Sequence, residues 1–267
     1  VYFYKRFINS KSNVYIHYHE YTTKAEYART SIVERLIHSK EQYLYQKAKW
    51  ISHTNAIRLE KFLNDEKLFK DKAFHKIMPN YPARDWAISN NSENKKTRLK
   101  IVYVGYSLTK EGSYFQETLQ FLEESEYPIE LNIYCMQSND FVKRLVGNHN
   151  YLIVNLHKAI SYKKLPEILS KHHIGLILYK AKTQNYIHNA PNKLFEYLSC
   201  GLDVWYPKEM QGIYNYDSEI QPKVLRLDFN QLKKYNLKTL IHDTKSKSRI
   251  NYFAENVYGE FLKVLNK

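Results

Sequence analysis

The sequence predicts an α/β protein with two domains, each containing a parallel sheet. Short runs rich in β-branched and aromatic residues alternate with stretches of helical periodicity along most of the chain. This alternation is typical of parallel sheets, because a helix usually connects one parallel strand to the next. The alternation is interrupted at residues 86–98, where apolar side chains are scarce, and we interpret that segment as a linker.

The first block, residues 1–85, is predicted to hold three strands and two helices. The strands are expected at residues 13–18, 50–53 and 76–78, and the helices at residues 23–48 and 55–64. Apolar residues recur at roughly helical spacing along residues 23–48, and Thr54 or Asn55 is a suitable N-cap for the second helix. Because residues 1–4 are already strand-like, we expect this domain to be incomplete and sequence upstream of it to be missing.

The second block, residues 99–250, restarts the same alternation. We expect strands at residues 99–104, 129–134, 151–155, 174–179, 202–206 and 224–227, with Gly105 ending the first. Helices are predicted at residues 113–124, 140–146 and 162–171, and a further amphipathic helix at residues 252–265. Residues 174–179 are apolar almost throughout, as expected for a parallel strand buried on both faces.

Composition limits the classes of function. Hydrophobic residues make up 43% of the chain, and 41 Lys and Arg against 27 Asp and Glu give a net charge of +14. This charge favours anionic partners such as nucleotide diphosphates, acidic lipid headgroups or nucleic acid. Two cysteines favour a reducing compartment over a disulfide framework. No secretory leader is expected and no apolar run approaches the ~20 residues of a membrane span, so we predict a cytoplasmic protein, with peripheral contact to the inner membrane face left open.

Residues 189–204 hold the signals for a short helix followed by a strand. Pro191 suits the first turn of a helix and Gly201 suits its left-handed C-cap, which leaves a helix of about three turns between them. Lys193 and Glu196 are three residues apart and therefore share a face. The helix start and Lys193 can bind a phosphate and Glu196 a sugar hydroxyl, as a nucleotide-sugar would require.

Four segments of the second block, in order, resemble the nucleotide-sugar-binding half of GT-B glycosyltransferases of the retaining family-4 type. They are residues 101–112, 165–169, 174–179 and 190–201, and residues 17–20 to 76–82 of the first block look like the later half of that family's N-terminal domain. The resemblance implies two Rossmann-like domains, the first of them incomplete and on the acceptor side. It also implies that residues 251–267 pack back toward the first domain.

The resemblance also implies roles for individual residues. Glu196 matches the family carboxylate that holds the ribose, and the position eight residues earlier, usually Glu, is His188. The implied site is His19 and His188 near the donor sugar, Lys110, Lys193, Asn192 and Gly105 near the diphosphate, and Glu196 at the ribose. Plainer alternatives remain open: a solvated carboxylate for Glu196, a surface lysine for Lys110 and a polar loop residue for His188. His17, His19 and Glu20 lack a third ligand, so no metal site is predicted.

We therefore predict a glycosyltransferase of polysaccharide synthesis that moves a sugar from a UDP- or GDP-sugar to a hydroxyl of a glycan or lipid-linked acceptor. The resemblance implies retention of configuration and no required metal or other cofactor. The alternative is a catalytically idle, glycosyltransferase-like binding or partner subunit. Basic stretches such as residues 95–100 leave an anionic membrane surface open as a partner, whereas no nucleic-acid-binding motif accompanies them. The oligomeric state is not predicted.

Overall fold

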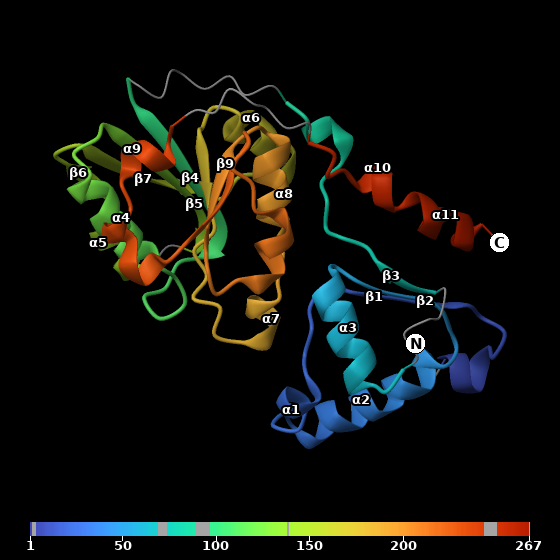
Figure 1. Cartoon of the computed structure of the whole chain (residues 1–267). Coiled ribbons are helices and arrows are strands. Elements are labelled where there is room, and N and C mark those ends of the chain that lie inside the picture. Colours follow the sequence, from blue (N-terminus) through green and yellow to red (C-terminus); the bar gives the residue numbers. More distant parts are fainter. Residues whose placement is uncertain (2–3, 69–73, 89–96, 138, 243–249, 267) are drawn as a thin grey trace.

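Two sheets occupy separate parts of the molecule in the computed structural model, which describes residues 1, 4–68, 74–88, 97–137, 139–242 and 250–266 (Figure 1). The larger sheet has seven strands and the smaller has three. Both are covered by helices, so the predicted α/β class is confirmed. Most of the linker predicted at residues 86–98 lies outside the described residues. Within the described part of the chain, no helix is both long and apolar enough to cross a membrane.

The seven-stranded sheet has a doubly wound order. In space its strands follow the order β10-β9-β8-β4-β5-β7-β6, and all neighbours are parallel except β6 and β7. Their bounds are β4 Leu99–Ser107, β5 Ile129–Gln137, β6 Gly147–His149, β7 Leu152–Lys158, β8 Ile174–Leu176, β9 Asp203–Pro207 and β10 Val224–Leu227. Numbered along the chain, the six parallel strands read 3-2-1-4-5-6, so the strand order reverses between β4 and β8.

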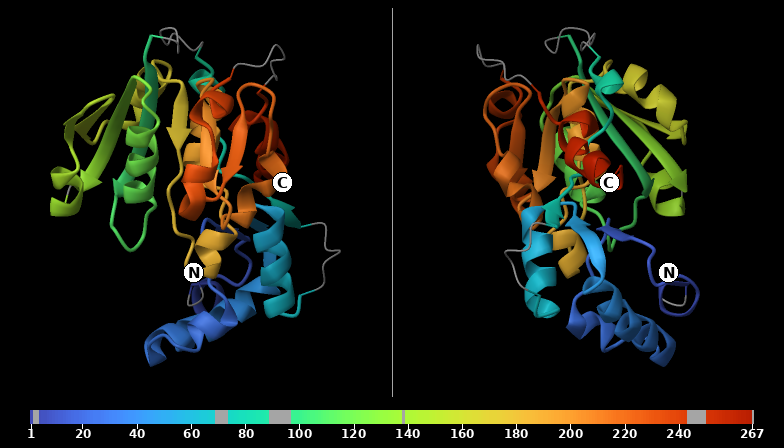
Figure 2. Two further views of the ribbon diagram at one scale, coloured as in Figure 1. Left: turned by 60° about the vertical axis from the view of Figure 1, so that its left-hand side comes forward. Right: turned by 90° about the vertical axis from the view of Figure 1, so that its right-hand side faces the viewer.

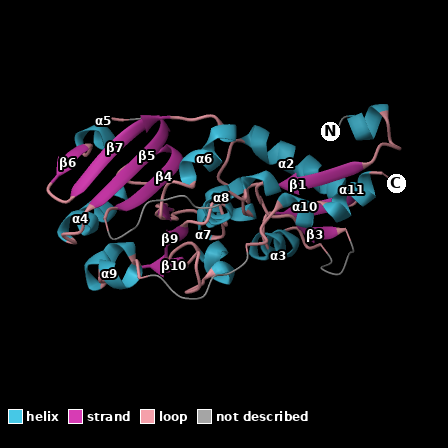
Figure 3. Ribbon diagram, turned by 90° about the horizontal axis from the view of Figure 1, so that it is seen from above, coloured by secondary structure: helices cyan, strands magenta, loops and turns pink. Residues whose placement is uncertain are grey.

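Helices cover both faces of this sheet because its strands are apolar on both sides. Ile101 and Tyr103 of β4 enter one core, and Val102 between them enters the other. Figure 3 shows α4 (Phe115–Glu124) and α9 (Leu237–Leu240) on one side of the sheet and α6 (Leu165–Leu169) and α8 (Asn192–Ser199) on the other. The remaining helices of this part are α5 Asp140–Arg144 and α7 Gln184–Ile187 with the 3-10 turns η3 Tyr162–Lys164, η4 Gln211–Tyr216 and η5 Phe229–Lys234.

A tyrosine bridges the point where β4 and β8 separate. The two strands pair only at Ile101 with Ile174 and at Val102 with Gly175. Beyond these pairs the Tyr197 hydroxyl accepts a hydrogen bond from the Val104 N–H at 3.1 Å and donates one to the Leu176 carbonyl at 3.4 Å. The backbone groups that the strands no longer pair are thereby satisfied, and a crevice can open at this edge of the sheet.

The smaller sheet is parallel, in the order β1-β2-β3. Its elements are β1 Val14–Tyr18, α1 Lys24–Tyr27, α2 Ile32–Tyr45, β2 Ala48–His53, α3 Ala56–Asp65 and β3 His75–Ile77, preceded by the π-turn η1 Tyr4–Ile8 and followed by the 3-10 turn η2 Arg84–Trp86. Asn55 is the N-cap of α3, because its side chain accepts the Arg58 backbone N–H at 3.0 Å. The predicted cap and helix position are confirmed.

The single helix predicted at residues 23–48 is wrong, because a second capping box interrupts it. Ser31 and Glu34 satisfy each other's backbone N–H groups and start α2 anew after α1. The predicted apolar face is also only partly buried. Leu44 and Tyr45 enter the core, whereas Ile32, Val33, Leu36 and Ile37 are 58–68% exposed and no described element covers them.

The last helix is divided as well, and it lies beside the small sheet (Figures 1 and 2). In place of one helix at residues 252–265, α10 (Ala254–Val257) and α11 (Gly259–Leu265) meet at Tyr258. The Phe261 ring lies 5.1 Å from the Trp50 ring, and Lys76 Nζ lies 2.9 Å from a Glu260 oxygen. Residues from the chain end therefore contact β2 and β3.

Gly175 is required by the close approach of β8 to α8. A Cβ at this position would come 2.2 Å from Cδ2 of Tyr197, and the bonded Tyr197 hydroxyl leaves the ring little freedom to move. We expect Gly175→Ala to lower the free energy of unfolding in urea by about 1–3 kcal/mol. As a control, Gly259→Ala meets nothing within 4 Å in α11. Its stability should be unchanged or higher by up to about 1 kcal/mol. Equal unfolding free energies for the two variants would contradict this account.

Candidate functional site

A cleft lies at the carboxyl end of β4, where the strand order of the large sheet reverses. Its volume is about 430 Å³, within the usual range of about 300–1,000 Å³ for small-molecule sites. Both parts of the molecule line it: His19, Glu20, Arg58 and Asn80 from the first part, and Val104, Gly105, Tyr179, Asn185, Tyr186, Asn189, Pro191, Asn192, Lys193 and Glu196 from the second. Crevices at such reversal points are the common ligand sites of doubly wound sheets.

Helix α8 begins at this cleft. Pro191 is its N-cap in an extended conformation, one position before the first turn that we predicted for it. The helix spans 8 residues, which is shorter than predicted, and Gly201 follows it with the expected positive φ of 78°. Backbone N–H groups in the first turn of a helix lack carbonyl partners, so the start of α8 can bind an anion in the cleft. Asn192 is exposed there.

Lys193 carries a buried positive charge at the start of α8. Only 7% of the residue is exposed, and its Nζ lies 4.5 Å from the Tyr103 ring centroid and 4.7 Å from that of Tyr179. Among the described residues, Nζ has no hydrogen-bond partner and no carboxylate within 4 Å. Burial opposes its charge, but the surrounding tyrosines outweigh this effect and raise the pKa of Lys193. The ammonium group is therefore charged, and the residue lines the wall of the cleft.

Glu196 lies one turn further along α8. It is 8% exposed, and burial raises the pKa of its carboxyl to about 7, although Lys193 and a hydrogen bond from Tyr162 act in the opposite direction. The carboxyl group is consequently part protonated near neutral pH. In its ionised form it can accept two hydroxyl protons from a ligand in the cleft.

Arg58 is a residue of this cleft that sequence reasoning missed. It is 1% exposed and donates to the His19 carbonyl at 2.7 Å and the Thr54 hydroxyl at 3.0 Å. It also donates to the carbonyl of Asn185 at 2.7 Å and to its side chain. Burial lowers the pKa of Arg58 to about 10, which leaves it charged at neutral pH. The sequence around Arg58 gives little indication of this role, because the partner Asn185 lies 127 residues further along the chain.

The structure brings five of the seven predicted site residues together at the cleft: His19, Gly105, Asn192, Lys193 and Glu196. His19 is exposed there, with its Nδ1 3.1 Å from the Asn80 side-chain oxygen. Strand β4 continues past Gly105 to Ser107, so Gly105 does not end the strand as predicted.

His188 and Lys110 do not line the cleft. The His188 ring is turned toward Gln184, with Nε2 3.0 Å from the Gln184 side-chain oxygen, and burial lowers its pKa to about 4. Helix α7, which was not predicted, ends at this residue and sets its orientation. Lys110 is exposed, and its carbonyl accepts a hydrogen bond from Lys180 at 3.1 Å. Neither side chain is placed for the predicted role.

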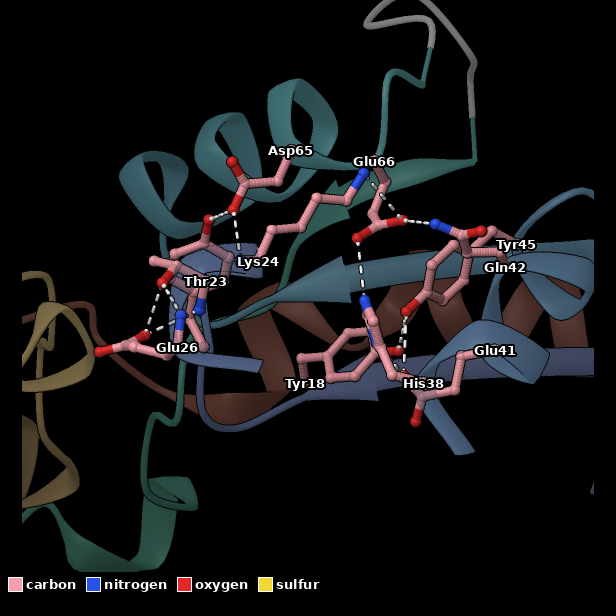
Figure 4. Close-up of polar contacts among 11 residues, drawn as sticks. Tyr18, Thr23, Lys24, Glu26, His38, Glu41, Gln42, Tyr45, Asp65 and Glu66 are labelled. Atoms are coloured by element: carbon pink, nitrogen blue, oxygen red, sulfur yellow. Dashed lines mark hydrogen bonds and ion pairs between the residues drawn. The ribbon is translucent and has the colours of Figure 1, made fainter. Parts of the chain in front are cut away.

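A second hollow of about 220 Å³ lies within the first part of the molecule and shares His19 and Glu20 with the cleft. Figure 4 shows polar side chains of this region, in which Tyr18 donates to Tyr45 and Tyr45 donates to Glu41. His53 lines the hollow, and neither of its ring nitrogens has a hydrogen-bond partner among the described residues. Burial, with Arg58 and His17 nearby, lowers the pKa of His53 to about 3, so the ring is neutral.

The described residues contain no group of three or more His, Cys, Asp or Glu that could hold a metal ion. The charged and polar groups of the cleft are two cations, the start of a helix, the carboxyl groups of Glu20 and Glu196, the imidazole of His19, two tyrosines and amide side chains. This set suits an organic anion that also carries hydroxyl groups.

Comparison with known proteins gives matches in structure only. No family model and no curated protein sequence matches the chain. The lipopolysaccharide outer core galactosyltransferase WaaB matches with a TM-score of 0.59 and 12% identity, over 86% of this chain and 65% of that one. Anabaena HepE, solved with UDP and glucose, matches with a TM-score of 0.62 and 12% identity, over 94% and 71%.

WaaG, a glycosyltransferase involved in lipopolysaccharide biosynthesis, matches with a TM-score of 0.53 and 13% identity, over 86% of this chain and 66% of that one. The chain thus spans slightly less than two thirds of WaaB and WaaG. At these identities the likeness concerns the fold, and it includes both sheets, because the match to HepE covers nearly the whole chain. The chain has the GT-B fold of these glycosyltransferases, as its sequence motifs imply.

Proposed function

We propose that the cleft binds a nucleotide-diphosphate-sugar and that the chain transfers the sugar to an acceptor hydroxyl. The observation that carries this proposal is the buried Lys193 ammonium group, which has no carboxylate partner among the described residues, lines the cleft at the start of α8 and is followed one turn later by Glu196. The structure of HepE with UDP and glucose supports the ligand class.

The donor would lie along the start of α8. Lys193 and the first N–H groups of the helix bind the diphosphate, and the backbone of Gly105 lies beside them in the cleft. Glu196 accepts the ribose hydroxyls, and Asn192 offers an amide at the rim. Both UDP- and GDP-sugars have these groups. Lys110 and His188 have no part in this arrangement, because their side chains lie elsewhere.

The sugar would face His19, which lies on the opposite wall of the cleft. In the reaction, the bond between the anomeric carbon and the diphosphate oxygen breaks and a bond to the acceptor oxygen forms, while the acceptor proton passes to the leaving phosphate. Lys193 stabilises the charge on that phosphate. We propose retention of configuration and a glycan or lipid-linked acceptor, which enters past His19 and Glu20 toward the hollow of His53. The neutral imidazole of His53 can both donate a hydrogen bond to a hydroxyl group and accept one from it.

Lys193 and Lys110 distinguish the site predicted from the sequence from the cleft seen in the structure. The sequence places both lysines near the diphosphate, whereas only Lys193 lines the cleft. We expect Lys193→Met to weaken binding of UDP-glucose or GDP-glucose about 10- to 100-fold, because a charge-assisted contact is lost. Lys110→Met should bind like the wild type. Titration calorimetry and thermal shift with UDP-, GDP- and ADP-glucose measure this. The cleft is not a nucleotide-sugar site if no donor binds the wild type or if Lys193→Met binds normally. Binding without transfer would indicate an idle binding subunit.

The pKa of Glu196 predicts how donor binding depends on pH. A diphosphate diester does not titrate between pH 6 and 8, whereas Glu196, with a pKa of about 7, ionises across this range. The affinity for UDP-glucose should therefore rise from pH 6 to pH 8 in the wild type, by up to about 10-fold. It should be flat in Glu196→Gln. A wild-type affinity that falls with pH, or a variant with the same slope, would refute the ribose assignment.

The Glu196 carboxyl group also predicts that the stability of the ligand-free protein falls as pH rises, whereas the affinity for the donor rises. The folded state binds the Glu196 proton more tightly than the unfolded state, so its contribution to stability falls as pH rises from about 4.5 to above 7. We expect Glu196→Gln to exceed the wild type at pH 8 by on the order of 3 kcal/mol at most, and to match it near pH 4.5. Urea unfolding at both values measures this, with the exposed Glu167→Gln as control.

The exposed apolar residues of α2 support the predicted contact with an anionic membrane surface. Ile32, Val33, Leu36 and Ile37 lie on a helix that also exposes Arg35 and Lys40, a combination that suits interfacial binding. The wild type should sediment with vesicles containing phosphatidylglycerol, and Leu36→Ser with Ile37→Ser should reduce the bound fraction. Equal binding to neutral vesicles, or full binding by the double variant, would count against this partner.

A further inference from the structure

Helix α7 is held by the first part of the molecule through hydrogen bonds at both of its ends. The Tyr21 N–H donates to the Asn185 side-chain oxygen at 3.0 Å, and Arg58 donates to the Asn185 carbonyl at 2.7 Å. At the other end, the Asn55 amide donates to the His188 carbonyl at 2.7 Å. Figure 1 shows α7 at the end of the large sheet that faces α3. A helix of 4 residues has few contacts of its own, so these bonds determine its position.

A series of ring contacts leads from α7 to Lys193. Tyr186, next to Asn185, has its ring 5.1 Å from that of Tyr179, and the Tyr179 ring lies 4.7 Å from Lys193 Nζ. Tyr179 and Tyr186 both line the cleft, and both also line the adjacent hollow of about 360 Å³. Tyr186 is 41% exposed. The packing around it alone therefore does not fix its ring, and the position of α7 decides where the ring lies.

We propose that Arg58 is a positioning residue that makes the anion site at Lys193 depend on contact between the two domains. By holding Asn185, it keeps Tyr186 against Tyr179 and Tyr179 against the ammonium group. Loss of this contact would release α7 and expose Lys193. The inference rests on the proposed function only in taking the anion to be a nucleotide diphosphate.

The chemistry of Arg58 suits this role better than that of a lysine. Its guanidinium group reaches the His19 carbonyl on one wall of the cleft and the Asn185 carbonyl on the other at the same time. A lysine has one nitrogen and cannot reproduce this fork. Arg58 has no ion pair with a carboxylate among the described residues, so its burial is offset by hydrogen bonds to oxygens on both sides. Separation of the domains would remove the two hydrogen bonds from Arg58 to Asn185.

The two cations also give the anion an effect on domain contact. Arg58 and Lys193 both line the cleft and are both at least nine-tenths buried, and the Glu20 carboxylate, which favours the charged form of Arg58, also lines it. A diphosphate between the two cations would be attracted to both. Binding of the anion should therefore tighten the contact at α7, and by linkage the contact should tighten binding of the anion by the same factor.

The test compares Arg58→Met and Asn185→Ala with Lys76→Met in the full chain. Lys76→Met removes the ion pair with Glu260, which also joins distant parts of the chain but does not touch α7. We expect Arg58→Met and Asn185→Ala to weaken UDP-glucose binding about 10-fold, as displaced site residues commonly do. Without nucleotide, both should speed acetylation of Lys193 by acetic anhydride relative to Lys110, and speed hydrogen exchange at the Ile187 and His188 amides. Lys76→Met should match the wild type in all three measurements.

The outcomes separate this inference from the proposed function. If no nucleotide-sugar binds the wild type but Arg58→Met still exposes Lys193 to acetylation, the proposed donor fails and the coupling stands. If Arg58→Met weakens binding while acetylation and exchange stay at wild-type rates, Arg58 contacts the ligand directly and the positioning role is overturned. If Arg58→Met does not fold, Asn185→Ala decides, because it removes the side-chain oxygen that accepts from Arg58 and from the Tyr21 N–H at a partly exposed residue and leaves the backbone carbonyl in place.

Discussion

The rest of the site depends on the Lys193 charge, which is buried without a carboxylate partner among the described residues. Placing an ammonium ion in a protein interior costs several kcal/mol, and a cation in the first turn of a helix also opposes the helix dipole. Lys193 meets both conditions, and the rings of Tyr103 and Tyr179 against its Nζ keep it charged. A bound anion would reverse both effects at once. A buried charge that is held in place beforehand, with no carboxylate partner among the described residues, suits a binding site for an anion.

The crevice that admits such an anion follows from one small residue. Gly175 allows the Tyr197 ring to lie against β8, where an added Cβ would come 2.2 Å from it. The Tyr197 hydroxyl then satisfies the backbone groups that β4 and β8 leave unpaired as they separate. Because the strands separate there, the start of α8 faces open space instead of another strand. The packing of β8 against α8 therefore decides where the charged residues of the site can act.

Local patterns predicted the large sheet well because its strands are buried on both faces. The strand at residues 224–227 was predicted with the bounds that the structure shows, and Asn55 was one of the two caps predicted for α3. Elements set by single hydrogen bonds were missed, as at Ser31, where a capping box divides the helix predicted at residues 23–48. Helix α7 and strand β6 are too short for periodicity to reveal.

The residues of the candidate site also differ in whether the local sequence could predict them. Lys193 and Glu196 were predicted because the residues that place them lie in the same helix, so the motif contains the geometry. Arg58 could not be predicted, because its partner Asn185 comes from a distant segment. His188 was assigned by its spacing from Glu196, but the intervening chain begins at the end of α7, which turns the ring toward Gln184. Spacing along a chain locates a side chain only where one regular element spans the interval.

The direction of α8 also determines how a nucleotide-sugar would lie. Lys193 and Glu196 are separated by three positions, which is a rise of about 4.5 Å along a helix. The positive end of the helix and the lysine precede the carboxyl group, so in the proposed complex the phosphate would bind at the start and the ribose further along. The reverse orientation would place the diphosphate beside Glu196, whose pKa of about 7 it would raise further. It would also leave the Lys193 charge beside uncharged hydroxyls. The sugar must then project from the start of the helix toward His19 and Arg58, which are contributed by the other domain.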